Sequence, residues 1–176
     1  MISSPNSRSS MAARHVLPDV LTPGLKIVFC GSAVGRKSAE LGLPYAGPGN
    51  KFWPTLFAAG FTPTQWGPAD FKKLPSLGYG LTDLNKIEFG QDAELTGIGD
   101  DTDALRAKIN KFKPRILAFT AKRPAIIFLA RKKVDYGFQA ERVADTRIYV
   151  LPSPSGLAVK FWDAALWRAL AEAMTA

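Results

Sequence analysis

The side chains that could do chemistry in this chain are mostly carboxylates, hydroxyls and amides, because histidine and cysteine are almost absent. His15 is the only histidine and Cys30 the only cysteine among the 176 residues. These counts exclude a Ser-His-Asp triad, a histidine-ligated zinc, a four-cysteine iron–sulfur cluster and an intramolecular disulfide. We therefore expect chemistry without a metal or a cofactor, and we interpret Cys30 as a small buried hydrophobe.

Small and polar residues gather in three segments that each follow a β-type run of apolar residues. The segments are residues 31–35, 82–86 and 152–156. The middle segment contains Asp83, whose carboxylate could orient a water molecule. Ligands of parallel sheets sit beyond the carboxyl ends of the strands, so the three segments are predicted to converge on one site.

Alternating strands and helices must position these segments. The short β-branched and aromatic runs that predict strands are Lys26–Gly31, Gly80–Leu84, Arg115–Phe119 and Arg147–Leu151. The stretches whose apolar spacing, caps or glycine stops predict helices are residues 51–60, 69–74, 102–112, 124–133 and 161–174. The alternation predicts an α/β fold, with three α/β/α layers around a central, mostly parallel four-stranded sheet.

Length, charge and composition predict one globular domain. No apolar run approaches the roughly 20 residues that span a bilayer, so we expect no membrane association. Residues 1–20 are rich in serine and arginine and lack the apolar core of a secretion signal. We interpret them as a disordered leader, followed by a single domain over residues 21–176. The net charge of +8 suggests a polyanionic partner such as nucleic acid, although many basic proteins bind nothing specific.

Two blocks of the sequence resemble one enzyme family. The first block, GSAVGRKSAELGLPYAGPGNKFW, spans Gly31–Trp53, and the second, LPSPSGL, spans Leu151–Leu157. Together and in this order they resemble the mismatch-specific uracil-DNA glycosylases and their thymine-DNA glycosylase relatives, from about residue 21 to about residue 157. The resemblance implies a uracil-DNA glycosylase-like fold and an enzyme that flips a damaged base out of DNA before cutting its N-glycosidic bond.

The resemblance implies a base pocket formed by the first block. The base-binding residues that it implies are Gly31, Ala33, Ser38, Tyr45 and Asn50. Tyr45 lies where the family stacks an aromatic ring on the flipped base, and a core tyrosine is the alternative. Ser38 either hydrogen-bonds the base or caps a helix, and Asn50 either contacts the base or caps the helix that follows it.

The second block resembles the family's DNA-gripping loop. The DNA-contacting residues that it implies, together with a nearby lysine, are Ser153, Pro154, Ser155, Gly156, Leu157 and Lys160. The serines and backbone N–H groups would hold phosphates, and Gly156 lets the backbone approach DNA closely. Leu157 would be the wedge that fills the gap left by the extruded nucleotide, with a buried leucine as the alternative.

The first block departs from the family at a position that matters for catalysis. The family usually has Gly-Ile-Asn-Pro-Gly where residues 31–35 read Gly-Ser-Ala-Val-Gly, and its asparagine positions the attacking water. Ala33 has no polar group for this task. In the second block Ser153 replaces an asparagine, and Ala158 and Val159 replace the basic residue after the wedge.

Two other groups are therefore our candidates for the catalytic roles. Asp83 could orient the water, because the resemblance implies a carboxylate in this region in some branches of the superfamily; a turn cap is the alternative. Ser32 belongs to a glycine turn whose backbone N–H groups could stabilise the departing base anion. Glu40 is a second candidate carboxylate, with a solvated surface glutamate as its alternative.

The sequence thus predicts a monofunctional glycosylase that removes uracil from single- or double-stranded DNA, as a monomer in the bacterial cytoplasm acting at the nucleoid. Ala33 favours a second hypothesis, a protein that recognises lesions or abasic DNA without cutting. A third hypothesis is a glycosylase for another base, such as hypoxanthine, xanthine or a mismatched thymine.

Overall fold

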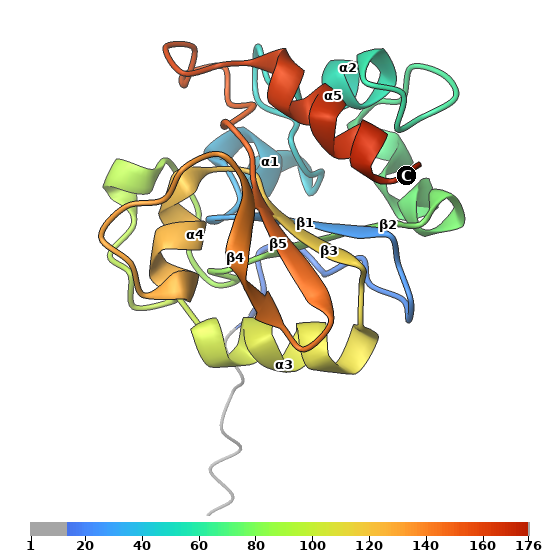
Figure 1. Ribbon diagram of the computed structural model, residues 1–176. Helices are drawn as coiled ribbons and strands as arrows, with labels where there is room; N and C mark the ends of the chain where they lie inside the picture. The colour runs from blue at the N-terminus through green and yellow to red at the C-terminus, as the bar shows by residue number, and fades with distance from the viewer. Residues whose placement is uncertain (1–13, 176) are drawn as a thin grey trace, which may run out of the picture.

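A five-stranded sheet forms the centre of the computed structural model, which describes residues 14–175 (Figure 1). The strands are β1 (Ile27–Gly31), β2 (Tyr79–Asp83), β3 (Ile116–Phe119), β4 (Gly137–Val143) and β5 (Thr146–Val150). Their order across the sheet is β2-β1-β3-β5-β4. The first four in this order are parallel, and β4 runs antiparallel to β5 at one edge.

Helices cover both faces of this sheet. They are α1 (Arg36–Leu41), α2 (Phe52–Ala58), α3 (Thr102–Phe112), α4 (Lys122–Leu129) and α5 (Ala164–Ala173), with 3-10 helices η1 (Pro68–Leu77) and η2 (Asp92–Glu94). Figure 1 shows α2 and α5 on one side of the sheet and α3 on the other. The buried residues of α4 pack in the same core as those of α3, which gives the predicted three layers.

Strand β1 is apolar at every position because it is buried on both faces. Ile27 and Phe29 point into the core under α2, η1 and α5, whereas Val28 and Cys30 point into the core over α3 and α4. A strand that is buried on both faces needs apolar side chains throughout, since successive residues alternate between the faces. Phe29 also stacks against Trp167 of α5, with ring centroids 6.0 Å apart.

The predicted α/β class and all four predicted strands are confirmed, but the sheet has five strands. The additional strand, β4, has the sequence GFQAERV and is mostly exposed or half-buried. Because most of its residues are not buried, β4 lacks the run of buried residues that the other strands have.

The boundary of the folded body also differs from the prediction. Val16 N–H donates to the Lys86 carbonyl at 2.8 Å, and Val20 and Leu81 exchange two hydrogen bonds of 2.9 Å. Residues 16–20, which fall inside the predicted leader, therefore lie against β2 and the loop that follows it. Residues 1–13 of that leader lie outside the part of the chain that the structure describes. A single isolated bridge is too short to be predicted as a strand.

None of the helices between residues 14 and 175 is long and apolar enough to cross a membrane.

Candidate active site

The ends of the parallel strands open into one cavity of about 780 Å³. All but one of the thirteen residues predicted to form the site line it. They are Gly31, Ser32, Ala33, Ser38, Tyr45, Asn50, Asp83, Ser153, Pro154, Ser155, Gly156 and Leu157. The exception is Lys160, which lies on the loop beyond Leu157 and is exposed. The predicted convergence of the three strand-end segments at one place is thus borne out.

The floor of the cavity is formed around Gly31, the last residue of β1. Gly31 is paired with Asp83 of β2 in the sheet register. A Cβ atom at position 31 would lie 2.7 Å from Asp83 Oδ1, 3.5 Å from the Tyr45 hydroxyl oxygen and 3.6 Å from Thr120 Oγ1. Three polar groups from three different elements therefore converge over a position that has no side chain.

Asp83 is desolvated and still reaches the cavity. Only 17% of its side chain is exposed, and its Oδ2 lies 3.6 Å from Lys86 Nζ. Burial raises the pKa of Asp83, and the positive charge of Lys86 opposes that shift. A carboxylate that is partly stripped of water and still borders a cavity is suited to accept a proton from a bound water molecule.

Tyr45 is held in place from two sides. Its ring stacks on Phe52, with centroids 3.9 Å apart and planes 12° from parallel, and its hydroxyl is hydrogen-bonded to Thr120 at 3.1 Å. Burial raises the pKa of Tyr45, with a further contribution from the charge of Asp83, so the hydroxyl stays protonated. One face of the ring thus packs on Phe52 while the residue lines the cavity, and stacking of a base on Tyr45 stays a prediction.

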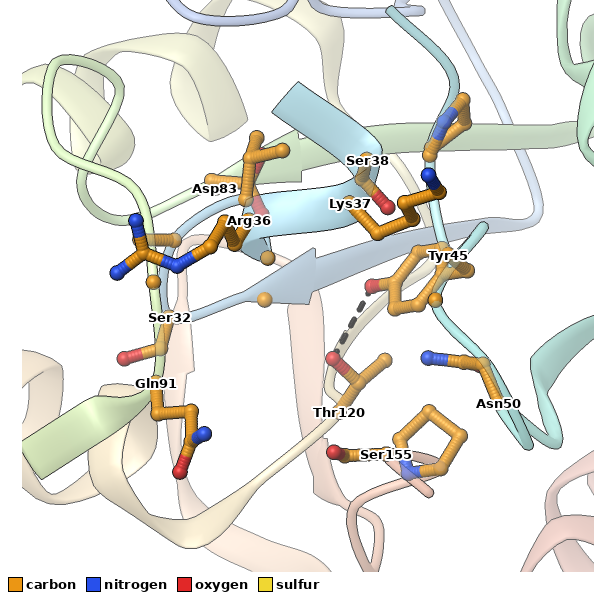
Figure 2. A pocket seen from close by; sticks show the side chains of 18 of the residues that line it. Ser32, Arg36, Lys37, Ser38, Tyr45, Asn50, Asp83, Gln91, Thr120 and Ser155 are labelled. Carbon is orange, nitrogen blue, oxygen red and sulfur yellow. Dashed lines mark hydrogen bonds between the residues drawn. The ribbon is translucent and has the colours of Figure 1, made fainter. Parts of the chain in front are cut away.

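Asn50 and Ser38 act locally on the loops beside Tyr45. Asn50 Oδ1 accepts a hydrogen bond from Phe52 N–H at 2.9 Å, which fixes the entry to α2. Figure 2 shows the amide nitrogen of Asn50 pointing into the cavity, so helix entry and base contact are compatible. Ser38 is buried in α1, and its hydroxyl oxygen accepts from Ala46 N–H at 2.9 Å. That bond holds the loop that carries Tyr45.

Ser32 has partners that the sequence did not reveal. Arg123 Nη1 donates to Ser32 Oγ at 2.6 Å, and Arg123 Nη2 contacts Asp100 Oδ2 at 2.7 Å. The backbone carbonyl of Ser32 accepts from Asn85 N–H, and that of Val34 accepts from Gly90 N–H, both at 2.9 Å. These bonds fix the turn over residues 32–35. Ala33 lies in this turn on the cavity wall and offers no polar side-chain atom.

The loop after β5 is anchored to the loop before α2. Lys51 N–H donates to the Pro154 carbonyl at 2.8 Å, and the backbones of Gly156 and Gly49 are in contact. Ser153 Oγ accepts from Ser155 N–H at 3.3 Å. Leu157 is 72% exposed at the cavity mouth, so the alternative of a buried leucine is wrong.

Residues that sequence reasoning missed complete the cavity. Thr120 follows β3, and the strand-end rule that selected Asp83 could have found it. One wall comes from residues 90–94, where Glu94 pairs with Arg36 at 3.0 Å. This wall depends on a loop whose hydrogen bonds centre on Asn85 and Glu88, and no sequence pattern indicates that loop.

Glu40 lies at the rim of the cavity rather than on its floor. It pairs with Lys37 at 3.5 Å, and both side chains are more than half exposed. A solvated carboxylate of this kind fits the surface alternative better than the catalytic one. Among residues 14–175, no three histidine, cysteine, aspartate or glutamate side chains are grouped as metal ligands would be.

Comparison with known proteins gives matches along nearly the whole chain. The model of the uracil DNA glycosylase superfamily matches residues 18–172. Among solved structures, the chain is similar to the solution NMR structure of a "putative uracil DNA glycosylase" from Methanosarcina acetivorans. The two share 25% sequence identity with a TM-score of 0.65, over 93% of this chain and 99% of that chain.

Proposed function

This chain belongs to the uracil DNA glycosylase superfamily, and we propose that it removes uracil from DNA by hydrolysing the N-glycosidic bond, leaving an abasic site. The observation that carries this proposal is the placement of Asp83 beside Gly31 on the cavity floor. The family motif supplies its water-orienting side chain two residues after Gly31, where this chain has Ala33. Asp83 reaches the same cavity from the neighbouring strand.

In the proposed reaction, the uracil nucleotide leaves the base stack and its base enters the cavity. The ring of Tyr45 contacts the face of the base, and Asn50 Nδ2 donates a hydrogen bond to one of its carbonyl oxygens. The loop over residues 153–156 holds the flanking phosphates, and Leu157 fills the space left in the stack.

Bond breaking then needs one water and two stabilising groups. The Asp83 carboxylate accepts a proton from water as the water oxygen bonds to C1′ of the deoxyribose. The N-glycosidic bond breaks and its electron pair leaves with the base as an anion. Backbone N–H groups of the turn over residues 32–35 stabilise that anion, which then takes a proton from solvent, and Asp83 returns its own proton to solvent. Positioned acid–base catalysis of this kind contributes roughly 10²–10⁴-fold to the rate.

Two alternatives have specific support. Ala33 favours a protein that binds lesions or abasic DNA without cutting. The cavity volume of about 780 Å³ does not restrict the ligand to a pyrimidine, which favours testing hypoxanthine and xanthine beside uracil. The resemblance to the mismatch-specific branch adds thymine opposite guanine as a third substrate to test.

The function is tested with end-labelled oligonucleotides that contain one uracil, either single-stranded or opposite adenine or guanine. We expect alkali-labile breaks at the uracil and release of free uracil without added metal. Matched oligonucleotides containing hypoxanthine, xanthine or a G·T mismatch define the base specificity. Binding to these oligonucleotides without any base release would contradict the enzyme and support the binding protein.

A further inference from the structure

The segment over residues 16–20 forms part of the wall behind Asp83. Leu17 is buried, and Leu17, Pro18 and Val20 line the same cavity as Asp83. Hydrogen bonds from Val16 and Val20 fix the segment along β2 and its following loop. Asp19 therefore stands at a defined position between Thr82, near the end of β2, and Lys108 of α3.

Asp19 belongs to a chain of charges that leads to Asp83. The Lys86 ammonium lies 2.9 Å from Asp19 Oδ1 and 3.6 Å from Asp83 Oδ2. The other oxygen of Asp19 lies 2.7 Å from Lys108 Nζ of α3. Thr82 Oγ1 also donates to Asp19 Oδ1 at 2.7 Å. Lys86 is thus shared between the carboxylates of Asp83 and Asp19, and the Asp19 carboxylate is also held by Lys108 and Thr82.

The interactions among these three charged side chains are strong because the side chains are shielded from water. The side chain of Lys86 is only 9% exposed, and those of Asp19 and Asp83 are 19% and 17% exposed. Charges this close interact more strongly in a desolvated site than at the surface. Although burial opposes the change, Lys86 and Lys108 lower the pKa of Asp19, so Asp19 carries a negative charge.

We propose that Lys86 and Asp19 are positioning residues of the active site, which hold the Asp83 carboxylate against Gly31 and set the pH at which it is ionised. The proposal rests on the proposed function, because it assigns to Asp83 the role of orienting water. Lys86 favours the ionised form of Asp83. Asp19 disfavours the ionised form of Asp83 in two ways: it carries a negative charge itself, and it competes with Asp83 for the Lys86 ammonium.

Apart from Lys108, the other groups near Asp83 carry no charge that competes with Lys86 and Asp19. Tyr45, from the loop before α2, and Cys30 of β1 both have raised pKa values, in each case first through burial, and both are therefore neutral. Thr120 at the end of β3 does not titrate. Lys108 on α3 acts on Asp83 from farther away, with the smallest contribution of the charged neighbours.

The two positioning residues should shift the pKa of Asp83 in opposite directions. Lys86→Met removes the stabilising cation, so the pKa rises and activity is lost at a higher pH on acidification. Asp19→Asn removes a like charge and leaves Lys86 to Asp83 alone, so the pKa falls and activity persists to a lower pH. We expect each shift to be about one pH unit. A merely structural role would lower activity without moving the profile in either direction.

The experiment measures two quantities on the full chain between about pH 3 and pH 9, a range that spans ordinary and raised carboxyl pKa values. The first is the titration of the Asp83 side-chain carboxyl carbon by ¹³C NMR, and the second is the single-turnover rate of uracil release. Lys86→Arg keeps the charge and should keep the wild-type profile. Lys111→Met removes an exposed lysine of α3 and serves as the matched control.

Opposite shifts for Lys86→Met and Asp19→Asn would support the proposal, and shifts in the same direction or none at all would overturn it. Should Lys86→Met fail to fold, a shift to lower pH in Asp19→Asn decides alone, and its absence overturns the proposal. Absence of uracil release by the wild type would refute the proposed function separately, because the NMR titration still reports whether Lys86 and Asp19 control Asp83.

Discussion

Gly31 is the residue around which the proposed chemistry is arranged. Its missing side chain leaves room where Asp83, Tyr45 and Thr120 approach from three elements. Each of these groups has a fixed neighbour: Lys86 for Asp83, Phe52 for the ring of Tyr45, and the Tyr45 hydroxyl for Thr120. A reacting atom placed above Gly31 would therefore meet groups that are already oriented.

Gly31→Ala tests this arrangement. The added Cβ would lie 2.7 Å from Asp83 Oδ1, so the carboxylate must move away while the strand backbone is unchanged. Displacing a catalytic group by about 1 Å lowers rates by roughly 10²-fold, and we expect a loss of that size in single-turnover uracil release. Thermal melting should change little. A variant that releases uracil at the wild-type rate would show that the carboxylate need not lie at this position.

At the level of single residues, the sequence predicted which positions gather but not how each is held. The motifs placed Tyr45 and Asn50 in the segment that lines the cavity, because a glycine-rich loop entering a helix is a local pattern. The motifs could not show that Arg123 hydrogen-bonds to Ser32, since those residues are 91 positions apart and the contact exists only in the folded chain. Asp19 was missed for the same reason, since it lies 63 positions from its partner Thr82. Lys86 lies in the predicted segment over residues 82–86, but its contact with Asp83 was not predicted.

Two loops, residues 47–50 and 154–157, act as one element at the cavity mouth. A Cβ at position 156 would collide with the backbone carbonyl of Pro48 and approach Gly49 Cα to 3.3 Å. Backbone atoms on both sides leave little room for adjustment. The close contact explains the glycine in the second motif by packing between loops, in addition to the approach to DNA that the sequence suggested.

Gly156→Ala should separate the two loops. We expect destabilisation of about 1–3 kcal/mol, the usual cost of forced overpacking, and weaker binding to abasic DNA. Melting temperature and the Kd for an abasic oligonucleotide are the measurements. Gly67→Ala is the matched control, since a Cβ there has no neighbour within 4 Å and its backbone φ of −121° suits alanine. Unchanged binding in Gly156→Ala would argue against a role of these two loops in binding DNA.

The elements that the sequence predicted are those with a continuous local signal. Strands β1 and β3 are apolar throughout, and β2 and β5 contain short β-branched or aromatic runs that are mostly buried. The helix over Thr102–Phe112 has an Asp101 cap and apolar residues at helical spacing. Helix α1 was missed because six residues show too little periodicity. The loop over residues 85–101 was missed because its order comes from Glu88, whose pKa is lowered to about 2, first by a hydrogen bond from the Thr96 hydroxyl.

For the whole molecule, the net charge of +8 fits a DNA partner, and the salt dependence of binding tests where that charge acts. The observed affinity should fall linearly on a log–log plot against salt, with a slope of about −0.9 for each phosphate contacted. Lys160 lies on the exposed loop beyond Leu157 and is predicted to contact a phosphate. Lys160→Ala should therefore reduce the slope by about one unit, whereas Lys111→Ala should leave it unchanged. Equal slopes for both variants would show that Lys160 does not contact a phosphate.

The proposed mechanism depends on one replacement: a carboxylate on β2 takes over the role of a side chain that position 33 lacks. Single-turnover release of uracil by Asp83→Asn, at protein concentrations that saturate the DNA, measures this directly. The predicted result is a rate lower by roughly 10²-fold or more, with unchanged affinity for abasic DNA and unchanged release by Glu40→Gln. Release by Asp83→Asn at the wild-type rate would contradict the account.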